Sequence, residues 1–393
     1  MSEPTRHVHP GVKNTEIWPG PKGYPWAETG LRCWTREALL RPLGGDSLLC
    51  TWTVGGFTEP HVGNYTMIQR SDDGGATWRS LGEFRHPTRG LFTSELFVPG
   101  GDEVHAFVQT YGNYAWMCHN HSYRAVSRDG GLTWSGPHSI PGGIHNVWAN
   151  RGILHSSGRW VIPVSWPELI GEEWAEPSCG RAPVAGRVGN RALMQVEMPY
   201  GADSGLLQNA GNQWADRNHR YCVGVMLSDD GGETFRLRGY VRGGKHGWLI
   251  EPRVVEVSGG RLVMLIRSQR DGWLWQSEST DGGETWSEAQ QSAIPNPAAK
   301  VNLLRATDGR LFLIHNPVPY EGDVPGRRNP LSLWVSEDDL RTWSAKLDLV
   351  WDDNPRVSLN YPDGYLDEQR GLLHFAWEDA RSVYLMKVPL NLC

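Results

Sequence analysis

Several arginines stand at the borders of apolar, strand-like runs, where their side chains could meet an anion. Arg36 opens the run REALL, and Arg267 stands near the end of RLVMLIRS. Arg328 precedes NPLSLWVSE, and the adjacent Arg327 is the alternative candidate for the same position. A guanidinium fork matches the paired oxygens of a carboxylate, and each charge-assisted hydrogen bond contributes about 1.5–3 kcal/mol. If the fold brings these side chains together at one end of the molecule, they would form a site for an anionic ligand. The alternative is that they make structural salt bridges.

A tyrosine and a glutamate offer complementary chemistry beside such a site. Tyr361 stands in LNYPDGYLDEQRGLLHFAW, and Glu251 opens EPRVVEVSGGRLVMLIRS. A bound carboxylate would repel a carboxylate nucleophile, whereas a tyrosine hydroxyl approaches neutral and can pass its proton to a glutamate. The pair therefore indicates nucleophilic chemistry. As alternatives, Tyr361 is an interior aromatic residue that hydrogen-bonds a neighbouring sheet, and Glu251 is the partner of a rim arginine.

Histidines offer a different chemistry. His61 shares the loop TVGGFTEPHVGNYT with Glu59, CHNHSY holds His119 and His121, and His145 lies on a further loop. In a lyase, arginine would neutralise a uronate carboxylate, and histidine or tyrosine would remove the neighbouring C–H proton. A single histidine is more often a polar filler. Since neither HExxH nor CxxC accompanies them, we expect no metal and no cofactor.

A short repeat indicates which elements must position these residues. The pattern Ser-x-Asp-x-Gly-x-Thr-Trp occurs at Ser71–Trp78, Ser127–Trp134, Ser228–Phe235 and Ser279–Trp286, and a copy at 336–343 has lost its glycine. Serine and aspartate can bond nearby backbone N–H groups, and glycine can take a positive φ. The final aromatic residue can plug the space between neighbouring sheets. Each copy is therefore expected to be a structural turn.

The spacing of the copies predicts the architecture. Most recur at intervals of roughly 50 residues, which is typical of a propeller with one four-stranded sheet per repeat. One double interval is interpreted as an insertion at about 167–218. The C-terminal run supplies three strands of a sixth sheet, and a strand before Arg36 completes it and closes the ring. We predict one all-β domain over 1–393, a six-bladed β-propeller, with seven blades as the alternative.

This architecture would gather the candidate residues on one face. In a propeller, loops that enter innermost strands share a face with loops between second and third strands, and the repeated turns lie on the opposite face. The insertion leaves from the candidate-site face, so it could cover the site as a lid. The residues expected to converge near the axis are Arg36, Glu251, Tyr361, Glu59, His61, Arg267 and Arg328.

Five such turns on six blades resemble the sialidase superfamily, whose repeats are called Asp boxes or BNR repeats. The resemblance covers nearly the whole chain. In that superfamily three arginines grip the substrate carboxylate, and a tyrosine nucleophile is paired with a glutamate. The resemblance therefore implies carboxylate-binding roles for Arg36, Arg267 and Arg328, with Arg327 as the competitor for the third position.

The resemblance also implies that Tyr361 attacks the anomeric carbon, with Glu251 as its proton partner. Sialidases are the tyrosine exception among retaining glycosidases. Their acid/base aspartate lies between the first arginine strand and the first box, and this loop has no aspartate here. Glu59 or His61 occupies that place and would protonate the leaving group. The histidines taken as further candidate substrate contacts are His119, His121 and His145.

The predicted function is that of an exo-acting glycoside hydrolase that cleaves a terminal acidic sugar, most simply an α-linked sialic acid. One alternative is a lyase or glycosidase acting on uronate-containing glycans such as rhamnose-glucuronate, because some propeller polysaccharide lyases and rhamnosidases resemble sialidases. A non-catalytic carbohydrate-binding propeller and an interaction scaffold are also compatible with these residues. An acidic carbohydrate is the expected partner.

Composition argues against several classes of partner. The 393 residues carry a net charge of −6 without a basic run, so nucleic acid is not expected. No apolar stretch reaches ~18 residues, so no membrane partner is expected. MSEPTRHVHPGVKN lacks an apolar signal core, which predicts a cytoplasmic protein, or a secreted or periplasmic one if a leader has been removed. Six cysteines without CxxC spacing favour reduced thiols.

Overall fold

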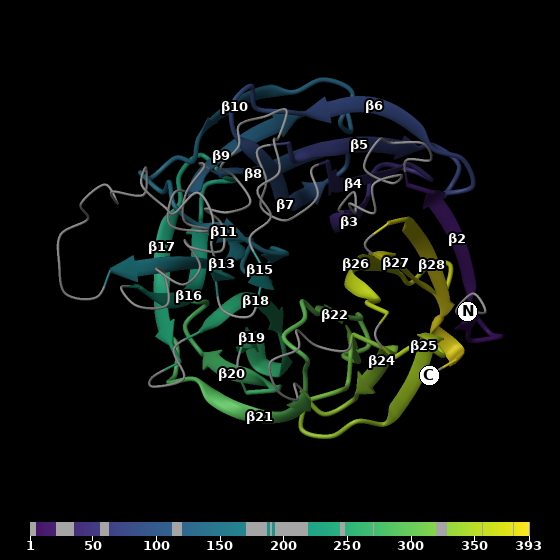
Figure 1. The fold of residues 1–393 in the computed structure, drawn as a ribbon. Helices are drawn as coiled ribbons and strands as arrows, with labels where there is room; N and C mark the ends of the chain where they lie inside the picture. The colour runs from purple at the N-terminus through teal and green to yellow at the C-terminus, as the bar shows by residue number, and fades with distance from the viewer. Residues whose placement is uncertain are drawn as a thin grey trace.

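Apolar runs separated by turn residues form antiparallel sheets around a central axis (Figure 1). The computed structural model describes residues 5–20, 35–55, 63–111, 120–169, 187–188, 191–192, 219–243, 248–269, 271–319, 328–355, 357–379 and 381–392. Within these residues there are six sheets of four or five strands and one short two-stranded pair. The prediction of an all-β, six-bladed propeller is therefore confirmed.

The strands of the first three blades run from the innermost outward. Blade 1 contains β3 (Arg36–Pro42), β4 (Leu48–Val54), β5 (Tyr65–Ser71) and β6 (Arg79–Phe84). Blade 2 contains β7 (Gly90–Gly100), β8 (Glu103–Tyr111), β9 (Asn120–Ser127) and β10 (Ser135–Ser139). Blade 3 contains β11 (Trp148–Ala149), β12 (Ile153–Leu154), β13 (Trp160–Leu169), β16 (His219–Ser228) and β17 (Arg236–Arg242).

The other three blades follow the same order. Blade 4 contains β18 (Leu249–Glu256), β19 (Leu262–Ser268), β20 (Trp273–Ser279) and β21 (Gln290–Pro295). Blade 5 contains β22 (Asn302–Arg305), β23 (Leu311–His315), β24 (Leu331–Ser336), β25 (Ala345–Asp352) and β1 (Arg6–Val8). Blade 6 contains β26 (Asn360–Asp367), β27 (Leu372–Glu378), β28 (Val383–Pro389) and β2 (Lys13–Trp18). The remaining elements are β14 (Arg187–Val188), β15 (Arg191–Ala192), η3 (Ser258–Gly260) and η4 (Leu390–Leu392).

The N-terminal segment closes the ring, as the sequence predicted. Strand β2 pairs antiparallel with β28 and becomes the outermost strand of blade 6, so N- and C-terminal segments share one sheet (Figure 1). Strand β1 adds a fifth strand to blade 5 by pairing with β25, which the sequence did not predict. Both pairings cover backbone donors and acceptors that a sheet edge would otherwise expose.

The double interval between the second and third boxes does not contain an additional blade. Strands β13 and β16 are hydrogen-bonded neighbours from Trp160↔Ser228 to Leu169↔His219, so the chain leaves blade 3 and returns to the same sheet. Of the predicted insertion, β14 and β15 pair with each other, and 170–186, 189–190 and 193–218 lie outside the described residues. No helix within the described ranges is long and apolar enough to cross a membrane.

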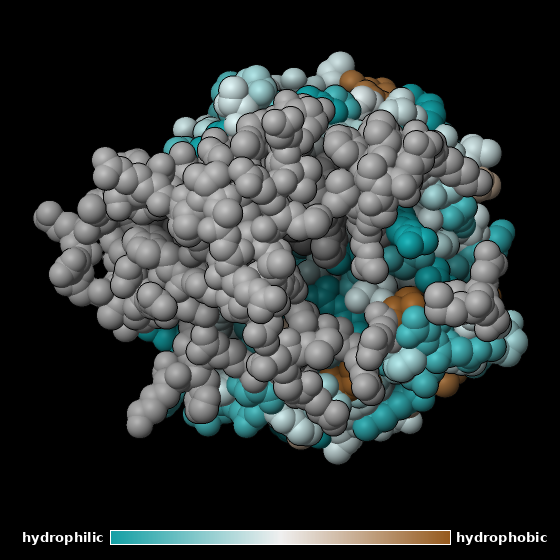
Figure 2. Space-filling view, in the orientation of Figure 1, coloured by the Kyte–Doolittle hydropathy of each residue, from teal (hydrophilic) through white to brown (hydrophobic). Residues whose placement is uncertain are grey.

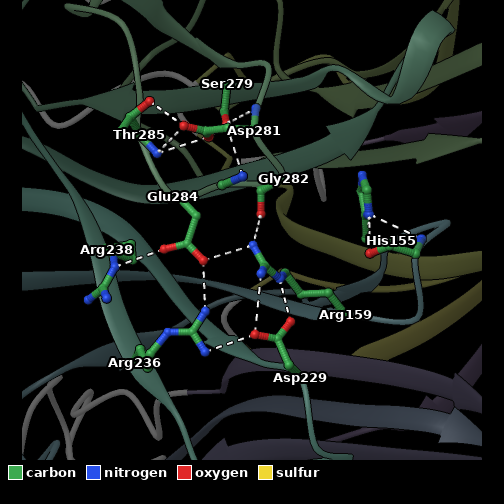
Figure 3. A network of polar contacts seen from close by, with 12 residues as sticks. His155, Arg159, Asp229, Arg236, Arg238, Ser279, Asp281, Gly282, Glu284 and Thr285 are labelled. Atoms are coloured by element: carbon green, nitrogen blue, oxygen red, sulfur yellow. Dashed lines mark hydrogen bonds and ion pairs between the residues drawn. The ribbon is translucent and has the colours of Figure 1, made fainter.

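Each box is held by the same set of hydrogen bonds. In the box of blade 4, Ser279 Oγ donates to Asp281 at 2.7 Å and accepts from Gly283 N at 2.9 Å. Asp281 in turn accepts from the backbone N–H of Thr285 at 3.0 Å and from its hydroxyl at 2.5 Å (Figure 3). These bonds pair the backbone N–H groups of the turn with side chains of the same box, which confirms the structural role that the repeat predicts.

The aromatic residue of each box packs between blades. Trp78 lies against an apolar cluster that contains Trp52 of blade 1 and Leu385 of blade 6. Gly75 has a φ of 86°, and a Cβ there would come too close to the Leu385 side chain, so both the backbone and the packing favour glycine. In the decayed fifth copy, Leu340 takes the left-handed position at a φ of 69° and still donates to Ser336.

Charged side chains also join neighbouring box turns. Arg159, which precedes β13, donates to Asp229 at 2.6 Å and to the Gly282 carbonyl at 3.0 Å. Arg236 reaches Glu284 at 2.7 Å and Asp229 at 2.8 Å, so the boxes of blades 3 and 4 share one network (Figure 3). We call this end of the propeller the box face.

The boxes make stability sensitive to acid. The side-chain hydrogen bond from Thr133 is the largest cause that lowers the pKa of Asp129 to about 2, and Thr234 does the same for Asp230. An unfolded aspartate titrates near about 3.9, so this stabilisation is complete above that pH and is lost as pH falls towards about 2. We expect the urea midpoint to fall steeply between about pH 4 and pH 2.

The Asp129→Asn/Asp230→Asn double variant tests this origin. It should begin from a lower midpoint at neutral pH and show a shallower decline in the acid range, because two of the titrating groups are gone. Glu288→Gln, an exposed carboxylate outside every box, serves as the control. If the urea midpoint fell equally steeply with pH in the double variant and in the unaltered protein, groups other than Asp129 and Asp230 would cause the acid sensitivity.

Candidate functional site

Three innermost strands begin with the same irregularity. Glu251 and Tyr361 have positive φ values of 51° and 46°, and Glu37, next to Arg36, has a φ of 57°. In each case the pairing with the second strand shifts register at that point. Left-handed backbone at non-glycine residues is costly and occurs often at functional sites, where a bulge re-aims a side chain. We call this end of the propeller, opposite the box face, the arginine face.

The three predicted arginines gather around Tyr361. The guanidinium carbon of Arg328 lies 4.9 Å from the centroid of the Tyr361 ring, and that of Arg36 lies 5.7 Å away. Arg267 forms a buried, short hydrogen bond with Glu251. The structure therefore brings together five of the predicted residues. Described residues visible near the centre of the ring present a mostly hydrophilic surface (Figure 2).

Electrostatics keep the glutamate of this cluster ionised. Burial raises the pKa of Glu251, but the charges of Arg267, Lys300 and Arg328 outweigh burial and leave the pKa below its ordinary value. For Arg267, burial lowers the pKa, and the Glu251 carboxylate followed by Tyr361 raise it above the ordinary value. A carboxylate held ionised in a buried site can accept a proton from a neighbouring hydroxyl.

Two residues of blade 6 that the sequence reasoning missed hold the arginines. Both oxygens of Glu378 accept from Arg36, at 3.2 and 3.1 Å, and the carboxylate is fully buried. Asn360 accepts from Arg328 at 2.9 Å and donates to Glu378 at 3.3 Å. The signal was present, because Glu378 ends the apolar run LLHFAW and Asn360 directly precedes Tyr361. The salt-bridge interpretation of Arg36 is thus compatible with a binding role.

A second missed pair neighbours Glu251 of the cluster. Lys300 makes a short, buried ion pair with Glu37. Burial is the largest influence on Glu37 and raises the pKa of that carboxyl, with Lys300 acting in the opposite direction. Lys300, which lies two residues before β22 of blade 5, thereby contacts β3 of blade 1 and adds positive charge near Glu251. A lysine inside the run NPAAKVNLL carries no motif that marks this role.

The remaining predicted residues are not part of this cluster as described. Glu59, His61, His119 and Arg327 lie outside the described residues, so their predicted positions stay predictions. His121, on β9, and His145 are exposed, and they are neighbours because Ser122 N donates to the His145 carbonyl at 3.0 Å. Among the described residues, no group of three or more His, Cys, Asp or Glu could hold a metal. Cys50 and Cys222 are buried free thiols.

A ring of six sheets with five box turns at one end and an arginine cluster at the other defines an Asp-box β-propeller. The chain belongs to the BNR repeat-like domain family, which matches residues 47–375. A sialidase from Bacteroides fragilis (strain YCH46) is 25% identical over 329 residues, which cover 73% of this chain and 49% of that protein. The chain therefore spans about half the length of this curated relative.

Solved structures show the same fold at low sequence identity. Hadza microbial sialidase Hz136 superposes with a TM-score of 0.63 at 16% identity, over 91% of this chain and 66% of that one. Trypanosoma rangeli sialidase gives a TM-score of 0.63 at 17% identity, over 98% of this chain and 61% of that one. A protein of unknown function from Dyadobacter fermentans DSM 18053 gives 0.65 at 15%, over 96% and 99%. The sialidase-type propeller is thus shared.

Proposed function

We propose that the protein is an exo-acting glycoside hydrolase of the sialidase superfamily that cleaves a terminal acidic sugar resembling sialic acid. The observation that carries this proposal is the gathering of Arg36, Arg267 and Arg328 around Tyr361, with an ionised Glu251 bonded to Arg267. One structural neighbour, Trypanosoma rangeli sialidase, has been solved as a covalent intermediate with 2,3-difluorosialic acid. Its fold is the one shared by this chain.

The arrangement supports a double displacement. The arginines bind the sugar carboxylate and place the anomeric carbon beside Tyr361. The Tyr361 oxygen attacks that carbon, its proton passes to Glu251, and the glycosidic C–O bond breaks as the leaving oxygen gains a proton. Glu59 or His61 supplies that proton. Water then attacks the anomeric carbon and gives one proton to Glu59 or His61, which regains the proton that it donated in the first step. Glu251 returns its proton to the departing tyrosine oxygen, and the enzyme is restored.

Of the two chemistries that the sequence suggested, this one fits the described residues better. The pair Tyr361 and Glu251 lies within the arginine cluster, as a hydrolase requires. His121 and His145 lie at the end of blade 2, each exposed to solvent. A lyase that uses histidine would need an imidazole beside the C–H bond next to the carboxylate, and neither of these two histidines is in the arginine cluster. We therefore place hydrolysis first.

A paired assay tests the proposal. The purified protein is incubated with a fluorogenic α-sialoside and, separately, with a uronate-containing glycan whose cleavage by elimination creates an ultraviolet-absorbing double bond. We expect fluorophore release and no new absorbance. Absorbance without fluorescence would replace hydrolysis by elimination. No turnover of either substrate, with saturable binding of free sialic acid, would make the protein a carbohydrate-binding propeller.

A further inference from the structure

A cavity opens at the opposite end of the axis from the arginine cluster. It has a volume of about 600 Å³ and lies where the innermost strands end, among Arg41, Glu95, Arg151 and Glu256. Strand β3 begins at Arg36 and ends at Pro42, which lines this cavity. The box turns lie at the same end, because Gly74 N donates to the Asp46 carbonyl of the β3–β4 turn at 2.9 Å. The cavity is therefore separate from the candidate active site.

The charged groups at the base of this cavity other than Arg151 form hydrogen-bonded ion pairs, although one terminal nitrogen of Arg253 is buried without a partner. Arg41 donates to Glu95 at 2.6 Å, to the Leu96 carbonyl, and to Asp363 by a short bond. Glu95 also accepts from Gly152 N at 3.1 Å. Arg253, on β18, donates to Asp363 at 3.3 Å. Two carboxylates are thus committed to two guanidinium groups and to backbone N–H groups.

Arg151 is the cation left over. Its guanidinium makes no hydrogen bond to any described residue, and its nearest carboxylate oxygen, on Asp363, lies 3.7 Å away. Only 16% of the side chain is exposed, and one terminal nitrogen is completely buried. Burial, followed by repulsion from Arg41, lowers the pKa of Arg151 to about 9. A buried ionised donor without acceptors destabilises the folded protein, because the water that it has lost is not replaced.

The charges around the cavity also leave an excess of one positive charge. The three guanidinium groups of Arg41, Arg151 and Arg253 face the two carboxylates of Glu95 and Asp363. Arg305 and Glu256, which also line the cavity, offset each other. One positive charge is therefore uncompensated, at a group whose planar fork matches paired oxygens.

We propose that this cavity is a second ligand site, which binds a small anion through a carboxylate or phosphate group held by the Arg151 guanidinium. The walls favour an organic anion with an apolar body, because Leu43, Phe97, Ile153 and Leu303 line the same space. The site is separate from substrate binding on the arginine face. An occupant would supply the missing acceptors and the missing negative charge together.

Binding of two probes to the intact protein tests the site. Inorganic phosphate and benzoate are titrated calorimetrically, and thermal unfolding is followed in parallel. We expect saturable binding that raises the midpoint, with benzoate tighter than phosphate if the apolar walls contribute. Arg151→Met removes the fork at similar volume and should weaken binding about 10- to 100-fold, which corresponds to one or two charge-assisted hydrogen bonds.

Three variants separate this site from other anion sites. Arg267→Met alters the arginine face and should leave the Arg151-dependent binding intact. Arg305→Met removes an exposed arginine at the cavity mouth and should have a small effect. Arg151→Lys keeps the charge without the fork, and an intermediate affinity is expected from it even if Arg151→Met folds poorly. Absence of binding to the unaltered protein, or binding lost in Arg267→Met but kept in Arg151→Met, would overturn the proposal.

Discussion

Replacing Tyr361 by phenylalanine is expected to lower kcat on an acidic glycoside by about 10³-fold or more, because the variant loses the nucleophilic oxygen. The ring itself would remain, and it is the ring that packs against the Arg36 and Arg328 guanidinium groups. Affinity for a sialic-acid-like ligand should therefore change far less than kcat. Steady-state kinetics and ligand titration on the same preparation measure both quantities.

Tyr365→Phe is the matched control. Tyr365 lies on the same strand, and its hydroxyl is 3.1 Å from His374 Nδ1, away from the arginine cluster. This variant should retain most of the activity. If Tyr361→Phe kept a kcat close to that of the unaltered protein, Tyr361 would not be the nucleophile, and the double displacement would have to be abandoned. Equal losses in both variants would indicate damage to β26 instead of lost chemistry.

The second large effect is expected on stability, at Asp363. This carboxylate lies on the axis, is 1% exposed, and faces Arg41, Arg151 and Arg253. Burial raises the pKa of Asp363, but these guanidinium groups outweigh burial and lower the pKa overall, so the group is ionised. Asp363→Ala should lower the free energy of unfolding by about 3–5 kcal/mol, because it leaves buried cations without their common partner.

Urea unfolding at neutral pH measures this loss. Asp308→Ala is the control, since Asp308 pairs with Arg310 at 2.8 Å on the surface, and such pairs contribute about 0–1 kcal/mol. A cost at Asp363 no larger than that at Asp308 would mean that water or backbone groups can replace the carboxylate. The expected difference follows from burial, because the Arg41 and Arg253 side chains beside Asp363 are only 4% and 2% exposed.

Asp363 belongs to a continuous set of charges that connects the two faces. The charged neighbours of Glu37 are Lys300, Glu251 and Arg253, and Arg253 donates a hydrogen bond to Asp363. The candidate catalytic groups therefore rest on buried ion pairs. Tyr361 and Asp363 lie on the same strand, β26, so the substitution at Asp363 is expected to displace Tyr361 as well. The activity of Asp363→Ala is therefore informative only where the variant is shown to be folded.

The sequence by itself determined the architecture. Hydrogen bonds within a box join residues two to four positions apart, such as Ser279 with Asp281 and Gly283, so local residue types suffice to specify the turn. The recurrence of those turns predicted six blades, and apolar runs located the strands. Tyr361 and Arg267 could be singled out because each stands at the border of such a run.

Only the tertiary structure decided which charges meet. Arg36 and Glu378 are 342 positions apart, and Arg41 and Asp363 are 322 apart, so no local pattern joins them. The register shifts at Glu251 and Tyr361 likewise depend on the second strand against which each innermost strand pairs. Closing the ring brings the starts of six distant strands together on one axis. At that axis, each buried charge pairs with the opposite charge that lies nearest to it in space, and the residue types alone do not specify which one that is.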